Sequence, residues 1–364
     1  MSKPTLIIGG MVLLGMLGAG LVLVLQPQSA GSTAPKASLG AKQPYAEIAN
    51  PSGFLNTPPS GSGQAGPITI GELVGKKVIL VDFMTYSCIN CQRTFPHVRN
   101  WYEKYKDKGL EIVGIHTPEF AFEKDINNVR IAMKEAGITY PVVLDNDYGT
   151  WRAWGNQYWP RKYLIDINGN VVYDHIGEGA YEETEMKIRE LLEERASVLG
   201  ENKVGMDKEL AVSNVPIERN VAQSPETYFG SSRNEYFANG TSGRQGEQTF
   251  SLPQTPSRNS LYLGGSWNIM PEYAESVSGG SVVYKYNAKE VYIVADADTP
   301  MEIEVLQDGK PIGTSRGAAV DTEGFVMIKE SRLYKLIRNE TPGEHVLELK
   351  VRGKGTRFYA FTFG

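Results

Sequence analysis

The sequence predicts an α/β domain with a mixed central sheet flanked by helices. A C-terminal antiparallel β-sandwich of jelly-roll type follows it, and an N-terminal transmembrane helix precedes it. In the first part, strand and helix patterns alternate and end in two adjacent strands and a helix, an order typical of a sheet with a parallel part and an antiparallel hairpin. From about Ala222 onward, short alternating runs separated by turn signals replace helical periodicity. At the other end, Pro4–Leu25 contains no charged residue.

The apolar segment Pro4–Leu25 is long enough to cross a bilayer as a helix. Lys3 precedes it, which is consistent with a cytoplasmic N-terminus. A cleaved signal peptide is the alternative, but its apolar region would be shorter, and no good small-x-small cleavage site lies near residues 28–30. We therefore expect an uncleaved single-pass anchor in the plasma membrane, with the rest of the chain on the extracytoplasmic (periplasmic or cell-wall) side.

Composition divides the 364 residues into five regions. Residues 1–27 form the expected anchor, and 28–45 are rich in small residues and proline with few large apolar side chains, which is typical of a flexible linker. The α/β domain is expected over 46–200, a second linker over 201–222 and the β-sandwich over 223–364. The net charge of −5 is well mixed along the chain and gives no indication of a nucleic-acid partner.

The elements of the α/β domain follow from apolar runs and helical periodicity. The stretch Tyr45–Thr57 contains large apolar residues and is expected to pack onto the domain. Strands are expected at Val78–Phe83, Leu110–His116, Pro141–Leu144, Lys162–Ile167 and Val171–His175. Helices are expected at Asn90–Lys106, Asp125–Ala136, Tyr148–Trp154 and Glu182–Leu199. The turn Asn168-Gly169-Asn170 favours a hairpin of the last two strands.

The C-terminal part shows seven alternating runs and no helical segment of any length. They are Asn259–Trp267, Ser281–Asn287, Glu290–Ala295, Met301–Gln307, Arg332–Arg338, His345–Val351 and Arg357–Phe363. Turn signals such as Asp308-Gly309 and Pro342-Gly343 separate neighbouring runs. This pattern predicts the antiparallel sandwich.

The cysteines of the chain are Cys88 and Cys91, and they form a C-x-x-C pair just after the apolar run Val78-Ile79-Leu80-Val81. A strand that ends in such a pair places the first sulfur at the N-terminus of a helix, where unpaired backbone N–H groups favour a thiolate. The second sulfur follows on the same helical face, within reach of the first. This arrangement predicts a redox-active dithiol.

Zinc binding and a structural disulfide are the alternatives to a redox pair. Zinc requires four ligands, and the four histidines of the chain are far apart in sequence, so we expect no metal and no other cofactor. A structural bridge closing so short a loop would constrain little of the unfolded chain. Redox chemistry is therefore favoured.

The first domain resembles the thioredoxin fold over residues 46–200 on four features in the right order. Besides the C-x-x-C pair, Asp82 resembles the buried acid behind the second cysteine, and Pro96 resembles the proline of the active-site helix. Trp159-Pro160, just before a strand, resembles the cis-proline loop that faces the dithiol. The resemblance implies that Pro160 is cis and that it aligns the backbone of Trp159 for pairing with a substrate.

The sequence is most similar to extracytoplasmic thioredoxins of the TlpA type, and among them to the soluble C-terminal half of DipZ proteins. The stretches 85–93 and 116–120 resemble the signatures of that group, and 224–230 and 359–364 extend the resemblance into the C-terminal domain. DipZ proteins carry an electron-transporting multi-span region, whose place is taken here by a single apolar segment. The resemblance therefore implies a separate, CcdA/DsbD-like membrane electron donor.

The expected chemistry assigns a role to each residue of the pair and to the acid. Cys88 attacks a disulfide of a protein substrate as a thiolate and forms a mixed disulfide. Cys91 then attacks the Cys88 sulfur and releases the reduced substrate. Asp82, a charge within an apolar strand, is expected to have a raised pKa and to take the proton of Cys91; an ordinary strand-end aspartate is the alternative.

Glu119 resembles an active-site glutamate of TlpA-type reductases and follows the second strand, at the sheet end where ligands bind in α/β folds. A solvated loop carboxylate is an equally good interpretation. His97 and His116 are expected to be structural or exposed. A peroxidase of the peroxiredoxin type is the rival enzyme, since Thr85 is correctly spaced before Cys88, but Val81 occupies the position of the required proline.

The C-terminal domain resembles a carbohydrate-binding module, which implies a possible cell-wall glycan partner. Five aromatic residues could form a sugar-stacking platform, although aromatic residues of β-sandwiches mostly fill the core: Tyr228, Tyr236, Phe237, Trp267 and Tyr273. The sequence as a whole predicts a membrane-anchored thiol:disulfide oxidoreductase acting as a reductase. A glycan- or partner-binding module with a vestigial redox domain is the second hypothesis.

Overall fold

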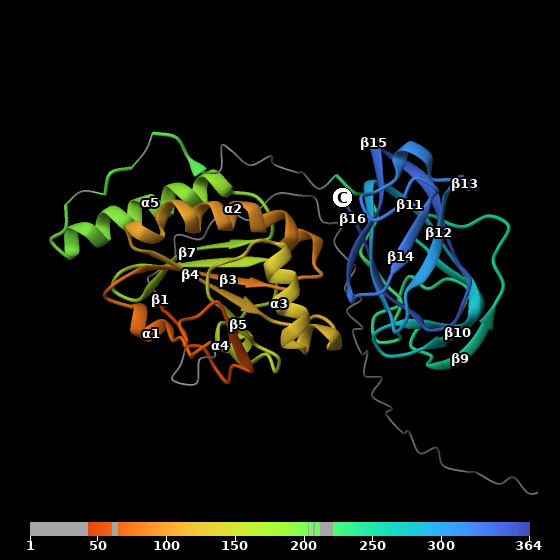
Figure 1. The fold of residues 1–364 in the computed structure, drawn as a ribbon, viewed down its shortest axis with the longest axis horizontal. Coiled ribbons are helices and arrows are strands. Elements are labelled where there is room, and N and C mark those ends of the chain that lie inside the picture. The colour runs from red at the N-terminus through yellow and green to blue at the C-terminus, as the bar shows by residue number, and fades with distance from the viewer. Residues whose placement is uncertain (1–42, 60–64, 203, 207, 212–220) are drawn as a thin grey trace, which may run out of the picture. The chain divides into compact units, whose positions relative to one another are not determined.

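The computed structural model describes residues 43–59, 65–202, 204–206, 208–211 and 221–364 (Figure 1). They form an α/β domain and, from residue 221, an all-β domain. No helix within these residues is long and apolar enough to cross a membrane. The expected anchor Pro4–Leu25 lies outside the described residues, as does most of the first linker.

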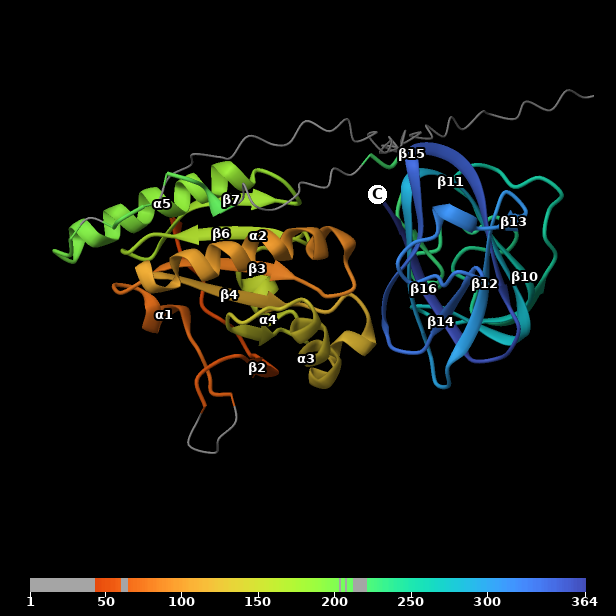
Figure 2. The ribbon, with the colours of Figure 1, turned by 45° about the horizontal axis from the view of Figure 1, so that its top comes forward.

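The α/β domain is built on a seven-stranded mixed sheet with the order β1-β7-β6-β3-β4-β5-β2. Its strands are β1 (Gln43–Pro44), β2 (Gly53–Leu55), β3 (Val78–Met84), β4 (Leu110–His116), β5 (Val142–Leu144), β6 (Arg161–Ile165) and β7 (Asn170–Ile176). The pairs β3–β4 and β4–β5 are parallel, and all other pairs are antiparallel. Figure 2 shows β7, β6, β3 and β4 side by side in this order.

Helices cover both faces of this sheet because its central strand is apolar on both sides. The helices are α1 (Ile70–Leu73), α2 (Ile89–Tyr105), α3 (Ile126–Glu135), α4 (Gly149–Ala153) and α5 (Tyr181–Val198). Val78 and Leu80 of β3 pack with residues of α2, α3 and α5, whereas Ile79 and Val81 pack with residues of α1 and α4. Figure 1 shows α2 and α5 on one side of the sheet and α1 and α4 on the other.

The expected helices and the main strands of this domain are confirmed, with end points that differ by one or two residues. The packing of Tyr45–Thr57 onto the domain is also confirmed, since Tyr45, Ile48 and Phe54 pack against the core and Leu55 belongs to it. The short edge strands β1 and β2 were not expected. Two or three residues are too few for a periodic pattern, and their partners β7 and β5 hold them in place.

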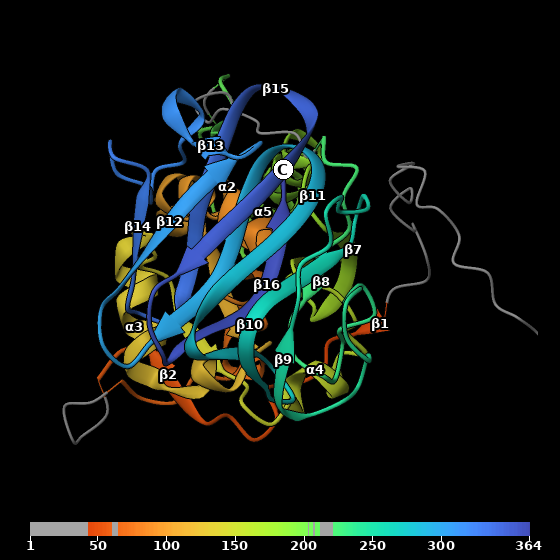
Figure 3. The same ribbon diagram turned by 90° about the vertical axis from the view of Figure 1, so that its right-hand side faces the viewer.

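The β domain consists of nine strands joined by hydrogen bonds into one sheet. They are β8 (Thr227–Tyr228), β9 (Gly246–Phe250), β10 (Leu261–Ile269), β11 (Ala274–Ala297), β12 (Met301–Gln307), β13 (Lys310–Pro311), β14 (Phe325–Ile328), β15 (Arg332–Val351) and β16 (Thr356–Phe363). Figure 3 looks onto this sheet, in which β12, β15, β11 and β10 follow one another. The all-β prediction is confirmed, but a sandwich of two separately bonded sheets is not observed.

Two long strands account for this difference. The runs 281–287 and 290–295 both lie within β11, and the runs 332–338 and 345–351 both lie within β15. The expected turn at Pro342-Gly343 is wrong, because both residues continue β15. Register shifts between Ala288 and Glu290 absorb the irregularity without ending either strand. The turn at Asp308-Gly309 is confirmed.

Candidate active site

Four loops meet at one end of the α/β sheet because of its register. In the parallel pairs, Met84 lies opposite His116, and His116 lies opposite Leu144. In the antiparallel pair, Phe83 lies opposite Arg161, the first residue of β6. The loops that follow β3, β4 and β5 and the loop that precedes β6 therefore lie at the same end, where ligands bind in α/β folds.

The C-x-x-C pair lies in the first of these loops, at the start of α2. Cys88 is the N-cap residue and is half-buried, whereas Cys91 is fully buried within the first turn. Both thiols are free. Burial raises the pKa of the Cys91 thiol well above its ordinary value, and hydrogen bonding to Cys88 raises it further. The geometry thus supplies one accessible sulfur and one sheltered sulfur.

Asp82 lies on β3 beneath the dithiol and is fully buried. Burial raises its pKa to about 6, and its negative charge in turn contributes to the raised pKa of Cys91. Neither carboxylate oxygen has a hydrogen-bond partner among the described residues. The sequence interpretation of Asp82 as a desolvated acid near the second cysteine agrees with this placement.

Sequence reasoning missed Lys162, which lies opposite Asp82 in the β3–β6 pair. Its side chain is almost completely buried, and its Nζ lies 3.9 Å from Asp82 Oδ1, an ion-pair distance without a hydrogen bond. The positive charge partly offsets the effect of burial on the pKa of Asp82. A lysine at the start of an expected strand was the available signal, and its burial requires a partner, since lysines are almost never fully buried without one.

The Trp159–Pro160 peptide bond is cis, as the resemblance implied. The Trp159 ring contacts the Trp151 ring at 4.4 Å between centroids and the Tyr148 ring at 6.4 Å. Pro160 directly precedes β6, so this loop lies at the same sheet end as Cys88. Trp154, another aromatic residue of this region, packs on Phe83 on the face of the sheet that α1 and α4 cover. Cys91 packs on the other face.

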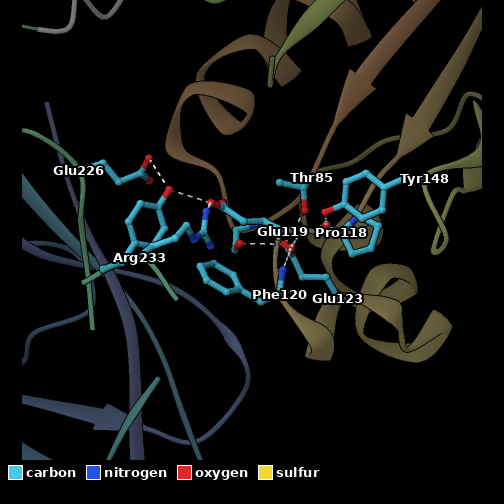
Figure 4. Close-up of polar contacts among 10 residues, drawn as sticks. Thr85, Pro118, Glu119, Phe120, Glu123, Tyr148, Glu226 and Arg233 are labelled. Atoms are coloured by element: carbon cyan, nitrogen blue, oxygen red, sulfur yellow. Dashed lines mark hydrogen bonds and ion pairs between the residues drawn. The ribbon is translucent and has the colours of Figure 1, made fainter. Parts of the chain in front are cut away.

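Glu119 is largely buried, and among the described residues its carboxylate bonds to the β domain and not to the cysteines. Its Oε1 accepts hydrogen bonds from Tyr228 Oη and Arg233 Nη1, both at 2.8 Å, and only 11% of its side chain is exposed (Figure 4). Both donors belong to the β domain. The solvated-loop interpretation of Glu119 is therefore wrong, and its carboxylate joins the two domains.

Glu123 connects the 85–87 loop with the loop that contains Glu119, and the sequence analysis missed it as well. Its fully buried carboxylate accepts hydrogen bonds from the hydroxyls of Thr85 and Ser87 and from the backbone N–H groups of Ser87, Glu119 and Phe120 (Figure 4). Burial raises its pKa, and these donors lower it in part. One carboxylate therefore ties the residue before Cys88 to the loop after β4.

Replacing Glu123 by glutamine is expected to lower the free energy of unfolding by about 2–4 kcal/mol, because an amide N–H₂ would face buried N–H donors. Urea unfolding of the full chain, followed by tryptophan fluorescence, measures this change. Glu135→Gln is the matched control, since its side chain is 63% exposed and its loss should cost less than about 0.5 kcal/mol. Equal effects of the two substitutions would contradict the structural role of Glu123.

The β domain also contacts the residues on either side of the dithiol. Tyr86 Oη donates a hydrogen bond to the carbonyl oxygen of Ser331 at 3.0 Å, and the Tyr86 ring stacks on His116. Arg93, two residues after Cys91, lies 3.3 Å from Glu178 and 3.7 Å from Glu290 of the β domain. No sequence signal links residues so far apart in the chain.

The remaining predicted residues have structural surroundings. His97 and His116 are buried, and His97 stacks on Tyr181, as expected for structural histidines. Of the aromatic residues of the β domain, Trp267 and Phe237 belong to its core, which agrees with the packing interpretation and leaves them unable to stack on a sugar. Within the described part of the chain, no group of three or more potential ligands could hold a metal ion.

Comparison with known proteins places this geometry in a family. Residues 30–192 match the Redoxin family model, and residues 224–364 match the model of the thioredoxin-like C-terminal domain. Protein DipZ of Mycobacterium bovis is 36% identical over 315 residues, which are 86% of this chain and 41% of DipZ. The chain thus spans less than half the length of that relative.

Smaller relatives match the α/β domain. The thiol-disulfide oxidoreductase ResA of Halalkalibacterium halodurans is 30% identical over 131 residues, which are 35% of this chain and 69% of ResA. The thiol-disulfide oxidoreductase YkuV of Bacillus subtilis is 28% identical over 153 residues, 42% of this chain and 97% of YkuV. The α/β domain has the thioredoxin-like fold, and the chain belongs to the family of thiol-disulfide oxidoreductases that includes ResA and YkuV.

Proposed function

We propose that this chain is a membrane-anchored reductase that transfers electrons to disulfides of extracytoplasmic proteins through Cys88 and Cys91. One observation carries the proposal: an accessible sulfur at a helix N-terminus adjoins a buried thiol whose pKa is raised and which lies near the buried acid Asp82. This asymmetry suits a nucleophile followed by a resolving thiol.

The reaction takes two displacement steps. The Cys88 thiolate attacks one sulfur of the substrate disulfide, which forms a mixed disulfide and releases the other substrate sulfur as a thiolate. The Asp82 carboxylate accepts the proton of Cys91, whose sulfur then attacks Cys88 and releases the second substrate thiolate. The substrate gains two electrons, and the chain is left with a Cys88–Cys91 disulfide.

A new cycle requires two electrons from outside this chain. The apolar segment Pro4–Leu25 supports anchoring in the membrane beside a donor. The similarity to the C-terminal part of DipZ supports a separate CcdA/DsbD-like membrane protein as that donor. In this proposal the two domains lie outside the cytoplasm.

The reduction potential of the full chain tests the direction of electron flow. Equilibration with a glutathione redox buffer is expected to give a reduction potential of about −270 mV for a reductase, as for thioredoxin. A strong oxidant would give a reduction potential of about −120 mV. The full chain should also reduce insulin in the presence of a chemical reductant. A potential near the oxidant value would contradict the reductase direction. Turnover of hydrogen peroxide in preference to disulfides would favour the peroxidase alternative.

A further inference from the structure

A cavity of about 260 Å³ lies beside the Trp159–Pro160 loop and is lined by both domains. The α/β domain contributes Glu119, Tyr148 and Trp159, and the β domain contributes Tyr228, Arg233 and Glu272 to its wall. Pockets for whole small molecules measure about 300–1,000 Å³, so this cavity suits a single side chain. Glu119 and Trp159 belong to loops at the sheet end that carries the dithiol.

The positive charge in this wall is already neutralised. Arg233 Nη1 forms an ion pair with Glu119 at 2.8 Å, and its guanidinium lies 3.7 Å from the centre of the Tyr228 ring (Figure 4). It also lies 5.4 Å from the centre of the Phe120 ring. An incoming anion would have to compete with the carboxylate of Glu119 for this guanidinium.

Negative charge is in excess around the cavity. Glu272 accepts a hydrogen bond from the backbone N–H of Ala121 through Oε2, and no cation pairs with it within the described residues. Behind Tyr228, Glu226 Oε2 lies 2.8 Å from Tyr228 Oη, so Glu226 and Glu119 share the single proton of this hydroxyl. Burial raises the pKa of Glu226 to about 7, and the negative charge of Glu119 contributes to this rise. A carboxyl group with this pKa is only partly ionised at neutral pH, and Glu119 is paired with Arg233. The excess negative charge of the cavity therefore comes from Glu272.

Aromatic rings complete a surface that attracts cations. Tyr148 and Trp159 line the cavity and their rings meet at 74°, whereas the Tyr228 ring is already in contact with the Arg233 guanidinium. The faces of such rings carry partial negative charge and bind ammonium or guanidinium groups. Carboxylates and ring faces together therefore select a positive side chain over a neutral or negative one.

We propose that this cavity binds the side chain of a lysine or arginine that flanks the reactive cysteine of the protein substrate. The inference rests on the proposed reductase function and deepens it, because it names a substrate class. The β domain is then part of the substrate-binding site, since it supplies Glu272.

Disulfide-bonded peptides that differ at one residue test this inference with the full chain. Lysine, glutamine or glutamate is placed in turn at positions flanking the reactive cysteine, and kcat/KM for reduction is measured at low salt. The wild type is expected to prefer lysine over glutamine by roughly fivefold to thirtyfold at one position. High salt should weaken this preference.

Variants of Glu272 identify the group responsible. Glu272→Gln keeps a carbonyl oxygen for the Ala121 N–H and is expected to bring the ratio of lysine to glutamine rates close to one. Glu272→Lys should favour the glutamate peptide. Glu235→Gln removes an exposed charge outside the cavity and should leave the ratio unchanged.

The outcomes separate the two proposals. Equal kcat/KM for all peptides, or a preference for glutamate by the wild type, would overturn the cation site while the reductase function stands. The same loss of preference in Glu235→Gln as in Glu272→Gln would also overturn it, because the effect would then follow net charge. Failure to reduce any of the peptides or insulin would overturn the reductase function itself.

Discussion

Cys88→Ser is expected to lower the rate of insulin reduction by roughly a thousandfold or more, because a serine hydroxyl at this position is not ionised and cannot form a mixed disulfide. Cys88 is the half-exposed sulfur of the pair, and Cys91 is buried and cannot replace it as the attacking group. Turbidity of reduced insulin measures the rate, with the unfolding midpoint as a check that the fold is kept.

Cys91→Ser is the matched variant, since it removes one sulfur of the same pair. It should form the mixed disulfide in the first step and then stop, so that mass spectrometry finds substrate attached to Cys88. A Cys88→Ser protein that reduces insulin at the wild-type rate would end the proposed mechanism. Attachment of substrate at Cys91 in that variant would reverse the two roles.

Asp82→Asn is expected to slow the resolution of the mixed disulfide by roughly a hundredfold, because the asparagine amide cannot accept the proton of Cys91. The buried thiol has a raised pKa and therefore needs a base before it attacks. Acid quenching followed by mass spectrometry measures the lifetime of the mixed disulfide. Asp107→Asn, an exposed aspartate, is the control and should leave this lifetime unchanged.

The pH profile gives the second signature of Asp82. Its folded pKa is about 6, above the ordinary 3.8, so the wild-type resolution rate should fall as the pH drops through about 6. The asparagine variant should lack this inflection. Because the folded pKa is raised, the stability that comes from the protonated form is lost as the pH rises through 6. The stability of the asparagine variant should not show this loss. A variant that resolves the mixed disulfide at the wild-type rate and keeps the inflection near pH 6 would remove Asp82 from the mechanism.

The sequence was sufficient for residues whose environment is local. The four apolar residues before Asp82 indicated a buried strand, and the C-x-x-C spacing placed Cys88 at a helix start. Asp82 could be assigned because a charge inside such a strand is costly without a purpose. These inferences depend on neighbours within a few positions along the chain.

Residues whose role depends on distant partners could not be found in this way. Arg233 and Glu119 are separated by 114 positions, and neither has a sequence context that points to the other. Glu123 gave no signal in the sequence, because its donors in the 85–87 loop are brought to it only by the β3–β4 register. Pro342-Gly343 had the composition of a turn, but pairing with β11 on one side kept the strand continuous.

The ion pairs of Arg93 have a consequence for engineering. A chimera that joined this α/β domain to a foreign C-terminal module would remove Glu290 and leave the buried guanidinium with one carboxylate fewer. Removing a partner from a buried charge costs about 3–5 kcal/mol, and this loss would fall two residues from the resolving cysteine. Swapped modules would therefore need to bring an acidic residue to the same point, so the two halves of the chain are exchangeable only as a matched set.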